Sequence, residues 1–301
     1  MYVDDFLTYI RCELNLSVHT VLSYRIDLHQ WADWATNGSR ETLDEKSVTV
    51  NDIRAWLAHL AKGGMSSRTI RRKTQALRAY FKYLMRYHGL TSNPAEEVIL
   101  SKTDKPLPVY VPQGEINTLL DERYDDTDFE QTRNHLILLM LYSTGMRRDE
   151  LITLTDKNVD LVKEELKVLG KRDKERIIPF GKELKEAIRS YLRLRNQEVA
   201  MQCDRFFVRQ NGKELYPKLV YNVVRETLTE GGVHSSRRSP HVLRHSFATD
   251  MLNNGAELTA VQHLLGHQSL ATTQVYTHIT YRELQNNYQL AHPRASKRKG
   301  G

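Results

Sequence analysis

The sequence predicts a two-domain, mainly α protein, with an all-helical first domain and a mostly α second domain that holds a small antiparallel β-sheet. Its 301 residues are about twice the usual length of one domain. Residues 101–112 contain three of the eight prolines. They separate two stretches that carry helix start and stop signals. Strand-like alternation is absent from the first stretch and occurs once in the second. We therefore expect domains at residues 1–100 and 113–301, joined by a linker at 101–112.

The composition excludes several classes of protein. With 40% hydrophobic residues the chain is too apolar for wholesale disorder, and no apolar run is long enough to span a bilayer. The first residues lack the basic and apolar regions of a secretion signal, so we expect a cytoplasmic protein without a membrane partner. Two cysteines, Cys12 and Cys203, are too few for a disulfide framework or a thiolate zinc site.

Helical periodicity and capping residues characterise the first domain. Helices are expected at residues 16–35, 50–62 and 66–88. Ser17 is a candidate N-cap of the first of these helices, and Thr49 or Asn51 opens the second. Because no strand pattern interrupts them, the sequence predicts a small bundle of about four helices.

One helix of this domain is strongly basic. Residues 66–86 contain seven basic side chains and no acidic one. At about 100° per residue, six of the basic residues fall within an arc of roughly 120°, and they are Arg68, Arg71, Arg72, Arg78, Lys82 and Arg86. Like charges along one face repel one another, so a polyanion would relieve the repulsion. We expect this face to bind nucleic acid, the alternatives being a solvated face or a membrane surface.

The second domain is expected to be mixed. Its helices are predicted at residues 113–120, 132–142, 182–194, 218–228, 241–253 and 258–265. Leu166 and Val168 alternate with polar residues, the run RIIPF that follows is rich in β-branched residues, and GKRDKE between them has the composition of a turn. This pattern predicts a hairpin with a cationic tip, which can carry Lys174 into a groove or a substrate.

The motif STGMRRDEL, at residues 143–151, indicates an anion site. Its Thr-Gly break ends an apolar run and puts Arg147 at the beginning of a new helix, where free N–H groups favour negative charge. Glu150 follows one turn later and can hold the guanidinium group by paired hydrogen bonds. Taken alone, the same pattern also fits an Arg–Glu pair on a protein surface.

The motif PHVLRHSFAT, at residues 240–249, carries groups that suit a phosphate. His241 and Arg244 are three residues apart and project from one helical face, with His245 on the same side. A histidine can exchange protons, and an arginine can neutralise charge that develops on the phosphate oxygens.

A last group of residues follows the expected helix at 258–265. Gly266 fits a left-handed C-cap, so His267 comes immediately after a helix end. Tyr276 lies nine residues later in the polar, β-branched context TTQVYTH. An isolated tyrosine is more often core or surface than catalytic, and only its combination with the other motifs singles it out.

Taken together, these motifs resemble the tyrosine recombinases, the DNA-cutting and rejoining enzymes that include phage integrases. The resemblance covers nearly the whole chain, with TGMRRDEL, GKRDKER, HVLRHSFAT, LLGHQS and VYTH in the family's order after the helical domain and the linker. The ending AHPRASKRKG is similar to that of the cellular Xer recombinases, which resolve chromosome dimers. The implied fold is an N-terminal core-binding (SAM-like) bundle followed by a tyrosine recombinase catalytic domain.

The resemblance also implies roles for individual residues. Arg147 and Arg244 clamp the scissile phosphate, and Glu150 supports Arg147. Lys174 is the general acid toward the leaving 5′ oxygen. No cofactor is expected, because two arginines offer bidentate donors to the developing negative charge without a metal.

Three further residues complete the implied site. His241 and His267 belong to the pocket, and Tyr276 is the nucleophile that forms a 3′-phosphotyrosine. The sequence has no DxD-like carboxylate cluster, which argues against a two-metal nuclease and leaves no metal ligands to assign.

The implied partner is double-stranded DNA that carries a recombination site. In the family, four subunits assemble around two sites and exchange strands through a Holliday junction. This resemblance admits a homotetramer or a heterotetramer with a second Xer-type recombinase, and a DNA translocase as activator. After Tyr276, the positions of Leu284, Tyr288 and Leu290 predict a short amphipathic helix, which in the family docks on a neighbouring subunit. Dimer resolution and integration or transposition of a mobile element remain alternatives with the same chemistry.

Two other classes of function are left to test. The first class is a DNA-binding regulator without catalytic activity. This interpretation accounts for the basic helix, but it gives no reason for the Arg, Lys, His and Tyr residues of the motifs in the second domain. A metal hydrolase would use the histidine pairs at i,i+4 spacing, 241 with 245 and 263 with 267. Neither pair has the intervening glutamate of an HExxH motif, and Arg244 would sit beside the metal.

Overall fold

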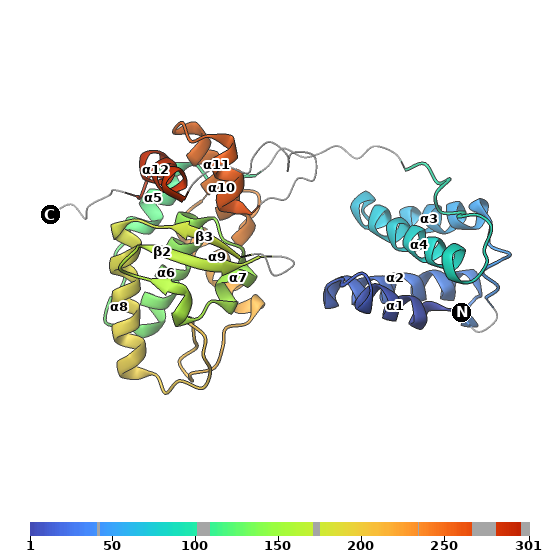
Figure 1. The fold of residues 1–301 in the computed structure, drawn as a ribbon, viewed down its shortest axis with the longest axis horizontal. Coiled ribbons are helices and arrows are strands. Elements are labelled where there is room, and N and C mark those ends of the chain that lie inside the picture. Colours follow the sequence, from blue (N-terminus) through green and yellow to red (C-terminus); the bar gives the residue numbers. More distant parts are fainter. Residues whose placement is uncertain (41–42, 101–108, 171–174, 234, 267–280, 296–301) are drawn as a thin grey trace. The chain divides into compact units, whose positions relative to one another are not determined.

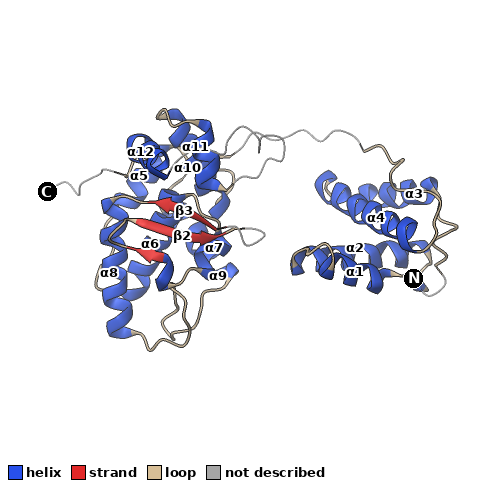
Figure 2. Ribbon diagram, viewed as in Figure 1, coloured by secondary structure: helices blue, strands red, loops and turns tan. Residues whose placement is uncertain are grey.

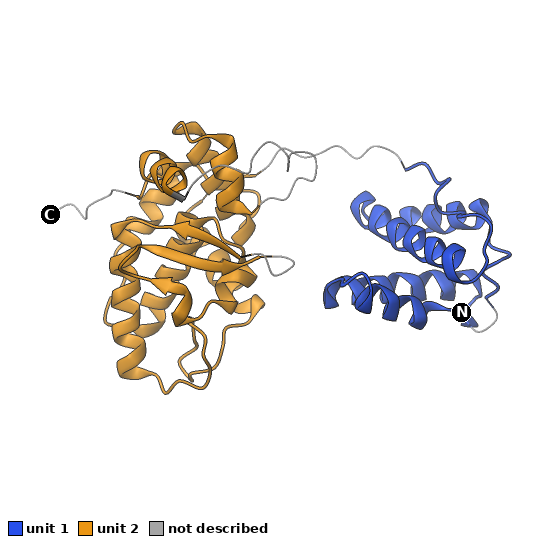
Figure 3. Cartoon of the chain, viewed as in Figure 1, with its two compact units in different colours: residues 1–106 blue, residues 107–301 orange. Residues whose placement is uncertain are grey.

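The protein is described here by a computed structural model, which places residues 1–40, 43–100, 109–170, 175–233, 235–266 and 281–295. The chain separates into two compact units, residues 1–106 and 107–301 (Figure 3). Among the placed residues, no helix is both long enough and apolar enough to cross a membrane.

Unit 1 is a helical bundle. In its described residues the α-helices are α1 (Val3–Cys12), α2 (Val18–Ala35), α3 (Val50–Lys62) and α4 (Ser67–Tyr87), as seen in Figure 1. Side chains cap three of the helices: Ser17 and Ser66 each accept a hydrogen bond from the backbone N–H three residues on. Thr49, rather than Asn51, opens α3 through a reciprocal capping box with Asp52. The bundle closes over large aromatic residues that include Trp31, Trp56 and Phe81. The helical fold expected for this part of the chain is confirmed.

Unit 2 combines helices with a small sheet (Figure 2). Its helices are α5 (Gln113–Asp121), α6 (Phe129–Thr144), α7 (Arg148–Thr153), α8 (Lys182–Glu198), α9 (Pro217–Glu230), α10 (Pro240–Asn253), α11 (Leu258–Leu265) and α12 (Tyr281–Ala291). Its strands are β1 (Val159–Asp160), β2 (Glu165–Leu169) and β3 (Glu175–Pro179), in the order β1-β2-β3 and antiparallel throughout. The predicted hairpin is β2 and β3; β1 is two residues long, too short to show alternation in the sequence.

Helix α6 forms the centre of unit 2. It packs against α5, α7, α8, α9 and α10, and most of its residues are buried. It starts three residues before the predicted helix because Asp128 caps it and accepts a hydrogen bond from the N–H of Gln131. It ends at Gly145, which has a φ of 60°. A Cβ atom there would lie 2.5 Å from Phe247 Cδ1, so this close approach requires glycine.

The C-terminal helix α12 packs on its own unit. It contacts α10, α11 and β3, and Tyr288 is fully buried. Asn254 donates a 3.0 Å hydrogen bond to the carbonyl oxygen of Ala291, and the guanidinium group of Arg294 forms ion pairs with Asp121 and Glu183. Of the three residues that predicted this helix, Tyr288 is buried in the core of unit 2 and Leu284 packs against it, whereas Leu290 is 86% exposed. Docking of this helix on a neighbouring subunit stays a prediction.

Candidate active site

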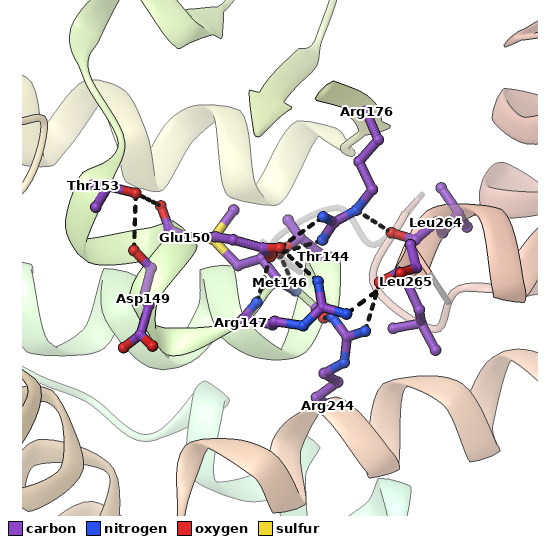
Figure 4. A network of polar contacts seen from close by, with 12 residues as sticks. Thr144, Met146, Arg147, Asp149, Glu150, Thr153, Arg176, Arg244, Leu264 and Leu265 are labelled. Carbon is purple, nitrogen blue, oxygen red and sulfur yellow. Dashed lines mark hydrogen bonds and ion pairs between the residues drawn. The ribbon is translucent and has the colours of Figure 1, made fainter. Parts of the chain in front are cut away.

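A buried carboxylate lies at the centre of the candidate active site. Glu150, in the first turn of α7, accepts hydrogen bonds from two arginines and is only 5% exposed. Burial by itself would raise the pKa of Glu150, but hydrogen bonds from Arg176 and Arg147 outweigh it and the pKa is lowered. Glu150 therefore stays ionised and holds both guanidinium groups in place (Figure 4).

Arg147 is the N-cap residue of α7, as the Thr-Gly break predicts. Its backbone N–H donates to Glu150 Oε2 at 2.7 Å, and its Nη1 donates to Glu150 Oε1 at 2.8 Å. Its Nη2 donates to the carbonyl oxygen of Gly266 at 3.4 Å. Because the side chain is 27% exposed, Arg147 can still reach a ligand from this fixed position.

Arg244 reaches the same place from α10. Its Nη1 and Nη2 donate to the carbonyl oxygens of Gly145 and Leu265, at 2.6 and 2.5 Å. Burial, followed by the nearby charges of Arg147 and Arg176, lowers the pKa of Arg244 to about 10, so the group remains charged at neutral pH. In Figure 4 its guanidinium group lies beside that of Arg147. The structure thus brings together the two arginines that the sequence motifs singled out.

Arg176 is a third arginine of this cluster, and sequence reasoning did not single it out. It lies on β3, opposite Val168 of β2, and donates to both carboxylate oxygens of Glu150 at 2.8 Å. Its Nε donates to the carbonyl oxygen of Leu264 at 2.7 Å. The only sequence signal was its place in β3 on the side that carries buried Ile178, where a charged residue needs a partner.

His241 and His245 lie one turn apart on α10, and both are exposed. Partial desolvation, together with the charges of Arg148, His245 and Arg244, lowers the pKa of His241 below 6.5. The imidazole of His241 is therefore mostly neutral at pH 7 and can accept a proton. Among the residues that the structure describes, no group of three His, Cys, Asp or Glu side chains could hold a metal ion.

Three of the predicted catalytic residues, Lys174, His267 and Tyr276, lie outside the described residues. A cavity of about 600 Å³ beside Arg147 is lined by Gly170 and Glu175, the two residues that flank 171–174. Gly266, the residue before His267, has a φ of 64° and ends α11 in the left-handed conformation, as predicted.

The basic face predicted in unit 1 lies on α4, and its residues fall into two groups. Arg68, Arg71, Arg72, Lys82 and Arg86 are exposed. Arg72 forms an ion pair with buried Asp27. Arg78 is partly buried and donates to the carbonyl oxygens of Ala95 and Val98, at 3.0 and 2.8 Å, so its guanidinium group fastens the chain that follows α4.

Family models match most of this chain. The model of the phage integrase family matches residues 110–283, and the model of the phage integrase N-terminal SAM-like domain matches residues 3–88. The chain belongs to the phage integrase family. As a member of this family of tyrosine recombinases, the protein is a site-specific recombinase.

Curated relatives match this recombinase over nearly its full length. It is 35% identical to tyrosine recombinase XerC of Chlorobaculum parvum, over 98% of this chain and 95% of that protein. It is 34% identical to XerC of Bacillus subtilis, over 99% and 98% of the two chains. It is also 34% identical to tyrosine recombinase XerD of Oceanobacillus iheyensis, over 97% and 98%.

Solved structures share the fold of the recombinase. The XerH site-specific recombinase bound to its difH substrate, in a pre-cleavage complex, is 23% identical, with a TM-score of 0.68 over 96% of this chain and 83% of that one. The Tn1549 transposon integrase in complex with transposon right end DNA is 20% identical, with a TM-score of 0.70 over 95% and 98%. These likenesses confirm the predicted fold class of a helical domain followed by a mostly α domain with a small sheet.

Proposed function

We propose that this recombinase cuts and rejoins double-stranded DNA at a specific site through a covalent 3′-phosphotyrosine intermediate and a Holliday junction, and that it resolves chromosome dimers at segregation. Similarity to XerC and XerD over nearly the whole chain supports this role. Integration or transposition of a mobile element would use the same chemistry, and the cellular target site distinguishes the two.

The observation that carries the proposal is the cluster of three arginines around Glu150. The cluster has three positive charges, on Arg147, Arg176 and Arg244, and one negative charge, on Glu150. Its net formal charge is therefore +2. A phosphodiester carries one negative charge and gains more on its oxygens when it is attacked. A fixed, partly buried surplus of positive charge stabilises such a transition state more than the ground state.

Within this site, Arg147 and Arg244 are assigned to the two non-bridging oxygens of the scissile phosphate, and Glu150 holds Arg147. Both guanidinium groups are anchored by the protein before the substrate arrives, which lowers the reorganisation needed during reaction. A planar guanidinium group offers two parallel donors, the geometry that phosphate oxygens accept.

The remaining steps are assigned to residues that carry protons. The hydroxyl oxygen of Tyr276 attacks phosphorus, its proton passes to His241, and the bond to the 5′ oxygen breaks as Lys174 donates a proton to that oxygen. A tyrosine hydroxyl has a pKa near 10 and needs such a base. A neutral His241 fits the role because its pKa is lowered. His267 completes the pocket, and the phosphotyrosine ester preserves the bond energy for rejoining.

The partner proposed for unit 1 is the DNA that flanks the cleavage site. The exposed arginines and the exposed Lys82 of α4 supply contacts to phosphates. We further propose a tetramer on two sites, either of this chain alone or with a second Xer-type recombinase, activated in the cytoplasm by a DNA translocase. Recovery of DNA fragments bound to the protein in cells would identify the target site. The position of that site would distinguish chromosome dimer resolution from movement of a mobile element.

A nicked suicide substrate that carries the recovered site tests the chemistry. Wild type and the control variant Tyr281→Phe should give a denaturation-resistant protein–DNA adduct on a 3′ phosphate, with a free 5′ hydroxyl. Tyr276→Phe should bind the site and give no adduct. An adduct in Tyr276→Phe, or one on the 5′ end, would refute the proposed mechanism, and binding without any adduct in wild type would favour the DNA-binding regulator.

A further inference from the structure

We infer that Arg176 is a positioning residue for cleavage, which acts through Glu150 and the end of α11 and does not touch the phosphate. The inference rests on the function proposed above. Three elements meet at this side chain: it comes from β3, pairs with Glu150 of α7, and binds Leu264 of α11. In Figure 4 it joins these elements from the side opposite Arg244.

The directions of its donors argue against direct contact with substrate. Nη1 and Nη2 of Arg176 each bond to one oxygen of Glu150, and Nε bonds to the backbone, so each nitrogen of the guanidinium group already has a protein acceptor. Arg244 is at least as buried, but its Nη atoms bond to backbone carbonyls, which leave its charge unpaired. Both Nη atoms of Arg176 bond instead to the carboxylate of Glu150, which neutralises that charge and leaves less of it for a phosphate.

Gly266 covers the Arg176 side chain. A Cβ atom on Gly266 would lie 3.2 Å from Arg176 Cδ and 3.3 Å from Nη1, so the backbone of the left-handed turn rests directly on the guanidinium group. The carbonyl of that same Gly266 accepts a hydrogen bond from Arg147. Arg176 thus sets the turn from which the chain continues to His267, and it supports one of the contacts that orient Arg147.

The charge balance shows why cleavage needs Arg176. With Arg176 in place, the negative charge of Glu150 is shared between two guanidinium groups, and positive charge remains for the substrate. Without Arg176, Glu150 and Arg147 form a neutral pair, or the buried carboxyl group takes up a proton and releases Arg147. The first outcome lowers the formal charge of the cluster from +2 to +1. The second keeps the charge but frees Arg147 from its fixed position and makes cleavage depend on pH.

Arg195 offers a matched control. It pairs through two nitrogens with Asp156, at 2.8 and 2.7 Å, donates to the carbonyl oxygen of Phe206 at 2.9 Å, and is 4% exposed. Like Arg176, Arg195 bonds to a carboxylate through two nitrogens and to one backbone carbonyl, and it lies outside the arginine cluster. The two differ in that the carbonyl bond of Arg195 comes from Nη1 and its partner Asp156 is 55% exposed. A merely structural role would make the two arginines equivalent in their effect on cleavage.

The first measurement is single-turnover cleavage with site affinity, on full-length protein. Arg176→Met should slow adduct formation on the order of 10²-fold and change site affinity little, whereas Arg195→Met should lower the melting temperature without slowing cleavage by folded protein. Arg176→Lys, which keeps the charge but loses the paired geometry, should be intermediate. In a Glu150→Gln background, Arg176→Met should have a reduced added effect, because only its contacts with Leu264 and Gly266 remain to be lost. A full added effect would make Arg176 a direct phosphate ligand and overturn the inference.

The second measurement needs no DNA. Carboxyl ¹³C NMR of the intact protein should show that the pKa of Glu150 lies below 4.5 in wild type and above it in Arg176→Met, and cleavage by this variant should fall as the pH is lowered through the new value. An unchanged pKa would overturn the inference. Absence of a Tyr276-dependent adduct in wild type would instead refute the proposed function, and a wild-type rate in Arg176→Met, with that adduct present, would refute only the role of Arg176.

Discussion

Nη1 of Arg244 donates a 2.6 Å hydrogen bond to the carbonyl oxygen of Gly145, the residue at which α6 ends. Nη2 of the same arginine binds the carbonyl oxygen of Leu265 at the end of α11. Carbonyl groups at helix C-termini carry partial negative charge, which suits a guanidinium group. Within the described residues Arg244 forms no ion pair with a carboxylate, so it is positioned by backbone groups and keeps its full charge for a ligand.

This relationship predicts that Gly145→Ala disturbs both the fold and the site. The new Cβ would meet Phe247 and Leu265 at 2.5 and 2.8 Å, and the φ of 60° is unfavourable for alanine. The free energy of unfolding should fall by about 2 to 4 kcal/mol. Cleavage should slow as the carbonyl that anchors Arg244 shifts. Chemical denaturation and adduct assays measure the two effects.

Gly114→Ala is the matched control for that substitution. Gly114 lies in α5 and has an ordinary φ. A new Cβ at this position would meet no heavy atom within 4 Å. Alanine should stabilise the helix by up to about 1 kcal/mol and leave cleavage unchanged. Equal stability of the two variants would contradict the close approach at Gly145.

The two groups of arginines on α4 should differ in their effect on DNA binding. Replacement of exposed Arg68 or Lys82 by alanine should weaken site binding and reduce the slope of log affinity against log salt by about one per lost phosphate contact. Arg78→Met should instead lower the melting temperature and keep the slope, because Arg78 bonds to Ala95 and Val98. Site affinity measured over a series of salt concentrations tests this difference. A reduced slope in Arg78→Met would show that Arg78 contacts DNA.

The C-terminal segment should stabilise unit 2 within one chain. Arg294 is buried against Asp121 and Glu183, so Arg294→Ala should reduce the free energy of unfolding by about 2 to 3 kcal/mol. Deletion of residues 282–301 should destabilise more strongly, since it also removes buried Tyr288, Ala291 and Ala295. Thermal unfolding checks both variants, and an unaffected 282–301 deletion would show that α12 does not stabilise its own chain.

Lys174 should act only on the leaving group. If it protonates the departing 5′ oxygen, a substrate with sulfur at that bridging position, a far better leaving group, should be cleaved equally well by wild type and Lys174→Ala. On ordinary DNA the variant should be slower by a factor on the order of 10² to 10⁴. Single-turnover rates on the two substrates make the comparison. A defect that persists with sulfur would transfer the role to Lys171 or reduce both lysines to phosphate binding.

The sequence by itself determined local helix boundaries and the motifs that carry the functional side chains of this protein. Ser17 marks a helix start, and Thr49 and Asn51 narrow a second start to two candidates, because a capping side chain bonds to backbone only two or three residues away. The Thr-Gly break before Arg147 and the left-handed Gly266 are likewise readable, since such signals depend on neighbours in the chain. Motif order was enough to indicate the family before any contact was known.

Only the tertiary structure decided which charges meet. Arg147 and Gly266 are 119 positions apart, and no periodicity connects them. The structure added Arg176 to the arginine cluster, turned Arg78 toward backbone carbonyls, and buried Arg294 in its own unit. A buried charge must find a partner wherever packing brings one near, and that partner depends on how distant elements fold together, which local sequence does not encode.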